Sequence, residues 1–219
     1  MKNIIFIAPP AAGKGTQSKL LSEKYNIPHI STGDLLREEI SKATPLGLSI
    51  KEDMEKGNLI TDEIVLKLLE NRLKKDDCNN GYILDGYPRN TMQALMYDEL
   101  LSRINKELGL VIFLDIDKEL ALKRTISRVV CSSCGASYNL LIEDVMPKKE
   151  GICDRCGMSL KARSDDNEET FLNRFDTYLN KTKDLIEYYQ NKEVLHKVEV
   201  TREKSALDVF NEIEEILNK

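Results

Sequence analysis

A short apolar strand that turns through a loop of small residues into a helix constrains this chain more than any other feature. Residues 4–7 are all apolar, a Gly/Ala/Pro loop follows, and Lys14, Gly15 and Thr16 stand where the helix begins. In such a turn backbone N–H groups and the positive end of the helix point at an anion, lysine supplies mobile charge, and a threonine hydroxyl can bind Mg²⁺. We predict a phosphate-binding loop, although Ala8 stands where the Walker A pattern has glycine and Thr16 comes one residue late. The alternative is a plain strand-to-helix turn with a surface lysine.

The remaining chain alternates between expected strands and expected helices. We expect strands at 29–30, 82–84, 110–114 and 194–200, and helices at about 15–25, 35–42, 45–56, 61–79, 90–104, 118–126, 167–190 and 206–217. Gly57 and Asn58 are expected to stop the third of these helices. Strands separated by helices of this length require crossover connections, and continuous apolar runs are typical of a sheet that is covered on both faces. The sequence therefore predicts an α/β domain built on a parallel sheet.

Composition limits the classes of protein to which the chain can belong. Its 219 residues can bury one sizeable core with inserted subdomains, and 41% hydrophobic with 32% charged residues is an ordinary soluble balance. No apolar stretch approaches the roughly 20 residues of a membrane span, and no signal peptide is evident, so we expect a cytoplasmic protein without a membrane partner. The net charge of −5 argues against nucleic acid as a partner.

Four of the five cysteines form two closely spaced pairs. Cys131 and Cys134, then Cys153 and Cys156, have the C-x-x-C spacing of a four-thiolate zinc site, and glycine follows each pair. Two disulfides are the alternative, which a reducing compartment disfavours. Four thiolates leave no open position for water, so we expect a structural Zn²⁺ that holds a small insert together. Cys78 stands apart as a lone thiol in a loop or at a helix end.

The other chemistry of the chain lies in carboxylates and arginines at strand ends and in loops. Asp85 follows an apolar triplet, where a Walker B acid would hold Mg²⁺ through water. Planar guanidinium groups bind two phosphate oxygens at once, and six candidates are present, namely Arg37, Arg89, Arg124, Arg128, Arg163 and Arg174. Taken singly, each is also compatible with a solvated surface residue. The adjacent Asp165 and Asp166 either orient arginines or form the acidic start of the long helix that follows.

Four motifs together resemble the adenylate kinase family, in its bacterial form with a long zinc-bearing lid. They are Gly13-Lys14-Gly15-Thr16-Gln17, Ser31-Thr32-Gly33-Asp34-Leu35-Leu36-Arg37, Leu84-Asp85-Gly86-Tyr87-Pro88-Arg89 and Asp165-Asp166-Asn167-Glu168-Glu169-Thr170. The resemblance runs from the first residue to the last helix. It implies a P-loop nucleoside-monophosphate kinase fold, with a five-stranded parallel sheet flanked by helices and two inserted mobile subdomains.

The resemblance also implies a domain organisation and a reaction. Residues 1–30, 61–127 and 165–219 would form the core, 31–60 the nucleoside-monophosphate subdomain, and 128–164 the zinc-binding lid. The implied reaction is the reversible, Mg²⁺-dependent transfer of the terminal phosphoryl group of ATP to AMP, which gives two ADP. Such a protein is expected to act as a monomer.

The resemblance assigns roles to individual residues. ATP is expected to contact Ala11, Ala12, Gly13, Lys14, Gly15, Thr16, Arg124, Arg128, Ser137 and Tyr138. AMP is expected to contact Thr32, Arg37, Asn58, Leu59, Ile60, Gly86, Tyr87, Pro88, Arg89, Gln93, Arg163 and Arg174, with Gln93 reading the edge of the adenine. Catalysis by positioning and charge is expected from Lys14, Asp85, Arg89, Arg124, Arg163 and Arg174, and no residue need act as a nucleophile.

The sequence departs from the family pattern at four positions. Ala8 and Ala11 replace common glycines, Val129 replaces the second arginine of a pair, and Val200 replaces a glycine expected beside the adenine. If a glycine position needs a positive φ, a Cβ there costs on the order of 1 to 2 kcal/mol. Alanine has the smallest side chain with a Cβ, so we expect a working loop. Two alternatives remain at this stage, a related kinase with another nucleotide acceptor and a non-catalytic nucleotide-binding zinc protein.

Overall fold

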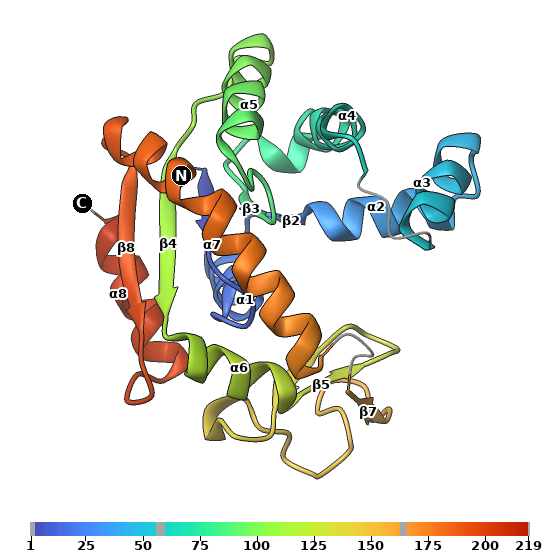
Figure 1. Cartoon of the computed structure of the whole chain (residues 1–219), viewed down its shortest axis with the longest axis vertical. Coiled ribbons are helices and arrows are strands. Elements are labelled where there is room, and N and C mark those ends of the chain that lie inside the picture. Colours follow the sequence, from blue (N-terminus) through green and yellow to red (C-terminus); the bar gives the residue numbers. More distant parts are fainter. Residues whose placement is uncertain (1–2, 56–59, 163–165, 219) are drawn as a thin grey trace.

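A five-stranded parallel sheet forms the centre of the molecule, as the sequence predicts. The computed structural model describes residues 3–55, 60–162 and 166–218. The strand order is β2-β3-β1-β4-β8, and every neighbouring pair is parallel (Figure 1). The strands are β1 (Ile4–Ile7), β2 (His29–Ser31), β3 (Ile83–Asp85), β4 (Leu110–Ile116) and β8 (Leu195–Val200).

Side chains that alternate along β1 divide the core into two layers. Ile4 and Phe6 belong to a hydrophobic cluster on one face of the sheet, and Ile5 and Ile7 belong to a second cluster on the other face. The main helices around the sheet are α1 (Lys14–Tyr25), α4 (Asp62–Leu73), α5 (Thr91–Arg103), α6 (Lys118–Ile126), α7 (Glu168–Asn191) and α8 (Ala206–Leu217). Helices α1 and α8 pack into the first cluster and α4 and α5 into the second, so the sheet is covered on both faces.

Two segments project from this core (Figure 1). On the β2 side lie α2 (Thr32–Ser41) and α3 (Pro45–Glu55). Beyond the end of α6, the chain forms a small antiparallel sheet in the order β6-β5-β7, made of β5 (Arg128–Cys131), β6 (Ser137–Asn139) and β7 (Leu160–Lys161). A 3₁₀ turn, η2 (Glu143–Val145), follows β6. The expected helix stop at Gly57 and Asn58 lies outside the described residues.

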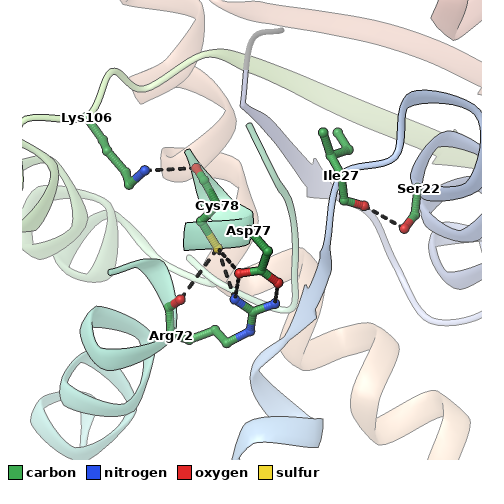
Figure 2. A network of polar contacts seen from close by, with 6 residues as sticks. All are labelled: Ser22, Ile27, Arg72, Asp77, Cys78 and Lys106. Atoms are coloured by element: carbon green, nitrogen blue, oxygen red, sulfur yellow. Dashed lines mark hydrogen bonds and ion pairs between the residues drawn. The ribbon is translucent and has the colours of Figure 1, made fainter. Parts of the chain in front are cut away.

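The expected helix at 61–79 is too long by six residues at its C-terminal end. Helix α4 ends at Leu73, and a separate 3₁₀ turn, η1 (Asp76–Cys78), follows it. The guanidinium of Arg72 explains the break, because it donates to both carboxylate oxygens of Asp77 at 2.8 and 2.7 Å and to Cys78 Sγ at 3.0 Å (Figure 2). These contacts require the chain to fold back on the last turn of α4. Cys78 lies in this turn, consistent with the expected lone thiol at a helix end.

Within residues 3–55, 60–162 and 166–218, none of the helices has both the length and the apolar composition that crossing a bilayer requires.

Candidate functional site

The loop between β1 and α1 has the backbone geometry of an anion-binding turn. Gly13 caps α1 with a φ of 99°, and Ala11 also has a positive φ, of 61°. Ala8, the other position where the family has glycine, is buried and does not have a positive φ. Only one of the two alanine substitutions therefore places a Cβ in the left-handed region. The N-terminus of α1, with its outward-pointing N–H groups, opens directly from this loop.

Lys14 folds back beneath the loop. Its Nζ donates to the carbonyl oxygens of Ala8 at 3.0 Å and of Pro9 at 3.4 Å. Burial lowers the pKa of Lys14 from its ordinary value of 10.5. Asp85 opposes this change, while three arginines, Arg89, Arg174 and Arg128, lower the pKa further. The charge of Lys14 is thus influenced by four side chains, from Asp85 at the end of β3, Arg89 in the segment after it, Arg128 of β5 and Arg174 of α7.

Asp85 lies at the carboxyl end of β3, directly beside the start of the loop. Strands β1 and β3 are in parallel register, with Phe6 opposite Asp85. His29 Nε2 lies 3.7 Å from Asp85 Oδ2, at the start of the neighbouring strand β2. Burial by itself raises the pKa of Asp85, but His29, Lys14 and Arg89 together outweigh it and hold the pKa below its usual value. The site therefore keeps an ionised carboxylate next to the loop, as the apolar triplet before Asp85 predicts.

The segment after Asp85 forms a wall of residues linked by hydrogen bonds to α2 and α5. Gly86 has a φ of 83°, and the peptide bond from Tyr87 to the buried Pro88 is cis. The Gly86 carbonyl accepts from Thr32 Oγ1 at 3.1 Å and from Arg89 Nε at 2.7 Å. A Cβ on Gly86 would lie 3.0 Å from Thr32 Oγ1, so both conformation and space call for glycine there. Predicted residues from three segments of the sequence, 31–37, 84–89 and 91–103, meet at this wall.

Gln93 completes the wall from the first turn of α5. Its Oε1 accepts from the backbone N–H of Arg89, and its Nε2 donates to Asp62 Oδ1, both at 2.7 Å. The Tyr87 hydroxyl donates to the Gln93 carbonyl at 3.1 Å. Gln93 is only 8% exposed. Its amide is therefore tightly held before any ligand is present.

The remaining predicted nucleotide contacts lie less deeply. Arg37 is exposed and pairs with Asp34, its neighbour on the same helix. Ile60 is half-buried just before α4. Asn58, Leu59 and Arg163 lie outside the described residues, so their placement stays a prediction.

Arg128 joins the small sheet to the start of α7. Its Nε donates to Asp166 Oδ2 at 2.7 Å, and its NH2 group donates to the other oxygen of the same carboxylate. The Asp166 side chain is only 1% exposed, and that of Arg128 is 19% exposed. Of the two interpretations of Asp166, orientation of an arginine is the one that this contact supports. Asp165 lies outside the described residues.

Arg124 lies at the end of α6 with a guanidinium that is partly withdrawn from water. Its Nε is buried without a hydrogen-bond partner among the described residues, and burial lowers the pKa of this side chain. The Arg124 carbonyl accepts from Asn139 Nδ2 at 2.8 Å, which fixes the junction between α6 and β6. A buried cation with an unused donor is suited to an anionic ligand.

The four paired cysteines converge into one cluster. Their sulfur atoms all lie within 4.8 Å of one another, with Cys131 and Cys156 at 3.4 Å and Cys134 and Cys153 at 3.5 Å. Tetrahedral Zn²⁺ with bonds of about 2.3 Å to sulfur places thiolates about 3.8 Å apart, so the donor set and its spacing fit zinc. None of these cysteines forms a disulfide.

Two matching turns build this cluster. Gly135 N–H donates to the Cys131 carbonyl at 3.0 Å, and Gly157 N–H donates to the Cys153 carbonyl at 2.8 Å. Both glycines have a positive φ, of 71° and 73°. Each turn therefore needs glycine after its second cysteine, as the sequence pattern indicates.

Tyr138 contacts the cluster from β6. Its hydroxyl lies 3.5 Å from Cys153 Sγ and accepts from Asp154 N–H at 2.9 Å. The hydrogen bond from Tyr138 is the main cause of a lowered pKa of Cys153, which favours the thiolate that a metal requires. Tyr138 was expected at ATP, as was the exposed Ser137 beside it. Binding of ATP by either residue stays a prediction.

Sequence reasoning missed two residues of the site. His29 lies beside Asp85, and Asp62 binds Gln93. The parallel pairing of β2 with β3 is the only signal that brings His29 near Asp85, and its register is not readable from two apolar runs. Asp62 reads in the sequence as an ordinary acidic residue in the first turn of a helix.

Comparisons with known proteins agree on one family. The family model described as adenylate kinase matches residues 6–194. The chain is 48% identical over 215 residues to an adenylate kinase of Clostridium tetani, with 98% of each chain covered. It is 46% identical over 217 residues to an adenylate kinase of Archaeoglobus fulgidus, covering 99% of this chain and 98% of the other. An adenylate kinase of Geobacillus is 41% identical over 215 residues, again with 98% of each chain covered.

Proposed function

The chain belongs to the adenylate kinase family and is an ATP:AMP phosphotransferase, and on that premise we propose how its residues divide the reaction between them. The phosphoryl group that moves between ATP and AMP passes through a loose transition state whose charge is spread over its oxygens. Positioning and cationic charge therefore supply most of the catalysis. The observation that carries the proposal is that the charges of Arg89, Arg128 and Arg174 all lower the pKa of Lys14 at the anion-binding turn.

The donor nucleotide binds on the side of the β1–α1 loop. The N–H groups of residues 11–16 surround the ATP phosphates, and Lys14 leaves the Ala8 and Pro9 carbonyls to follow the moving phosphoryl group. Burial lowers the pKa of Lys14, which marks a cation with incomplete hydration, and a phosphate would restore its missing partner. Arg124 adds a second poorly solvated cation.

Residues beside the loop fit a magnesium ion that arrives with ATP. The Thr16 hydroxyl and the Asp85 carboxylate, the latter through water, would hold it, and both are oxygen donors of the kind that Mg²⁺ prefers. Asp85 suits this role because its neighbours hold its pKa below the usual value and keep it ionised. When bound, Mg²⁺ neutralises charge on the phosphates of ATP.

The acceptor binds at the wall formed by Thr32, Gly86 and Gln93. Arg89 is anchored through Nε to the Gly86 carbonyl at 2.7 Å, which leaves its terminal nitrogens for the phosphate of AMP. Gln93 reads the adenine edge. We assign Arg37, Ile60, Tyr87, Pro88 and the predicted residues of 58–59 and 163 to the same nucleotide.

Two subdomains close over these nucleotides. We assign residues 31–60 to the flap that covers AMP and 128–164 to the lid that covers ATP, with the remainder as the core. A structural Zn²⁺ on the four cysteines stabilises the lid, and its closure excludes water that would otherwise hydrolyse ATP. The protein acts as a monomer in the cytoplasm, where the five cysteines that the structure records as free thiols stay reduced.

Measuring the formation of ADP from ATP and AMP, with and without Mg²⁺, tests this assignment. The same assay with UMP or GMP as the acceptor tests the choice of nucleotide. The decisive variant is Arg89→Ala, which should lower kcat by at least about a hundredfold. Arg103→Ala is the matched control, because Arg103 is exposed and pairs with Glu70 on the protein surface. An Arg89→Ala enzyme with the parental rate, or equal use of UMP, would contradict the assignment.

A further inference from the structure

A single hydrogen bond joins the start of α4 to the residue that we assign to the acceptor base. Gln93 Nε2 donates to Asp62 Oδ1 at 2.7 Å, across 31 positions of sequence. Asp62 is the first residue of α4 and is half-buried. The sequence pattern gives Asp62 only the role of an acidic residue in the first turn of a helix.

The chemistry of its two partners fixes which way the Gln93 amide points. A backbone N–H can only donate, so the atom that faces Arg89 must be the amide oxygen. An ionised carboxylate can only accept, so the atom that faces Asp62 must be the amide nitrogen. Turning the amide over would place its nitrogen against the Arg89 N–H, so that two donors face each other. It would also place its oxygen against the Asp62 carboxylate, so that two acceptors face each other. Both hydrogen bonds would be lost.

The rest of Gln93 is held as firmly as its amide. Its N–H donates to the capping Asn90 side chain at 2.9 Å, and its carbonyl accepts from the Tyr87 hydroxyl. Gln93 is 8% exposed, and its two amide contacts leave one lone pair on the oxygen and one hydrogen on the nitrogen for a ligand, in a fixed order.

We propose that Asp62 is a positioning residue that sets the acceptor-base specificity by locking the Gln93 amide in one orientation. This inference rests on the proposed function, in which Gln93 reads the base. Adenine presents an amino donor next to a ring-nitrogen acceptor, which matches the fixed order of the amide. Hypoxanthine and guanine present a carbonyl acceptor next to an N–H donor, the reverse order. Asp62 thus rejects IMP and GMP, because accepting either one requires the forbidden flip.

The neighbouring Glu63 separates this role from an ordinary helix effect. Both carboxylates lie in the first turn of α4 and interact favourably with the helix dipole. Glu63 is exposed, and it has no recorded contact with Gln93. Replacing either residue by alanine removes the same helix-end charge, but only one of the two replacements frees the amide.

Steady-state kinetics with AMP and IMP as alternative acceptors test the proposal. For Asp62→Ala we expect KM for AMP to rise about tenfold and the AMP/IMP ratio of kcat/KM to fall about tenfold, with KM for ATP unchanged. Asp62→Asn can present either its oxygen or its NH₂ group to Gln93, so it no longer forbids the flip, and we expect the AMP/IMP ratio to fall by less than in Asp62→Ala but measurably below the parent. Glu63→Ala should stay within about twofold. The leucine side chain is branched at the same carbon as that of aspartate but has no polar atoms. Asp62→Leu therefore replaces Asp62→Ala if the alanine variant has a markedly lower Tm than the parent.

Gln93→Ala distinguishes failure of this inference from failure of the proposed function. If Gln93→Ala leaves both KM for AMP and the AMP/IMP ratio at parental values, Gln93 does not read the base and both proposals fall. If Gln93→Ala changes them while Asp62→Ala and Asp62→Leu do not, only the role of Asp62 is overturned. In the Gln93→Ala background, a further Asp62→Ala change should have no additional effect on the AMP/IMP ratio. An additive effect would likewise overturn the inference.

Discussion

Replacing Ala11 by glycine should stabilise this protein, which is the opposite of what glycine does at most positions. Ala11 has a φ of 61°, in the left-handed region that a Cβ disfavours, whereas its neighbour Ala12 is not among the residues with positive φ. The strain at Ala11 is a local property of the loop, because the backbone direction there is set by the turn from β1 into α1.

The expected gain follows from two opposing terms. Relief of the left-handed conformation is worth about 1 to 2 kcal/mol. The additional conformational freedom of glycine in the unfolded chain costs about 0.4 to 1 kcal/mol. The net effect of Ala11→Gly is therefore a stabilisation of about 0.5 to 1 kcal/mol, or about 2 to 3 °C in Tm for a chain of this size.

Ala12→Gly is the matched control in the same loop. Ala12 is 2% exposed and has no positive φ, so its replacement loses a buried methyl group and gains no relief of strain. We expect a destabilisation of about 1.5 kcal/mol. Equilibrium urea unfolding and calorimetry on the two variants and the parent give the comparison, and ATP titration gives the second readout. Affinity of the Ala11→Gly protein for ATP should change by no more than about tenfold.

Two results would refute this reasoning. If Ala11→Gly loses as much stability as Ala12→Gly, the left-handed conformation at residue 11 carries no strain. If the parent does not turn over and Ala11→Gly restores its activity, the expectation of a working loop in the parent is wrong.

Three other perturbations have signs that the structure fixes. The folded pKa of Asp85 lies below its ordinary value of 3.8, so its contribution to stability is complete above that value and is lost as the pH falls below it. The free energy of unfolding of Asp85→Asn should therefore depend less steeply on pH below 3.8 than that of the parent. Asp184→Asn, which changes an exposed carboxylate, is the control, and identical acid-unfolding curves for Asp85→Asn and the parent would contradict this reasoning. Cys153→Ser, or treatment with a zinc chelator, should lower Tm by at least about 5 °C, because either one removes the metal that holds the insert together. A protein that is purified with far less than one zinc per chain, and whose Tm changes with neither treatment, would exclude the metal. Asp166→Ala strands the Arg128 guanidinium and should cost about 3 kcal/mol in urea unfolding, and a loss below about 1 kcal/mol would show that the pair is not a strong link.

Local patterns predicted the elements of the fold closely where one strong signal sets each end. Helix α6 spans 118–126 and α8 spans 206–217, both as expected, and in the structure the side chains of Asp117 and Ser205 cap their first turns. The expected helix at 61–79 is longer than α4 because the end of α4 depends on the contacts of Arg72 with Asp77 and Cys78. Hydrophobic periodicity does not encode contacts of this kind between side chains. The parallel sheet followed from the alternation of strands and crossovers.

The same distinction between local sequence patterns and packing of separate elements holds for the candidate site. Asp85 beside the loop could be predicted, because carboxyl ends of neighbouring parallel strands meet at one edge of the sheet. The cysteine cluster could be predicted from its spacing alone. Contacts of Asp62 with Gln93 and of Tyr138 with Cys153 could not, since both depend on how separate elements pack and not on any local sequence rule.

The cysteine cluster has a consequence for which part of the molecule unfolds first. Among the described residues, the hydrophobic cluster around it contains just Cys131, Ala136 and Cys153, with Tyr138 and Leu160 packed against them. So small an apolar centre cannot sustain a folded unit by burial alone, so sulfur chemistry sets the integrity of this appendage. If zinc occupies the cluster as proposed, loss of the metal or oxidation of its thiolates would unfold this small sheet, while the central sheet keeps its own two hydrophobic clusters and stays folded.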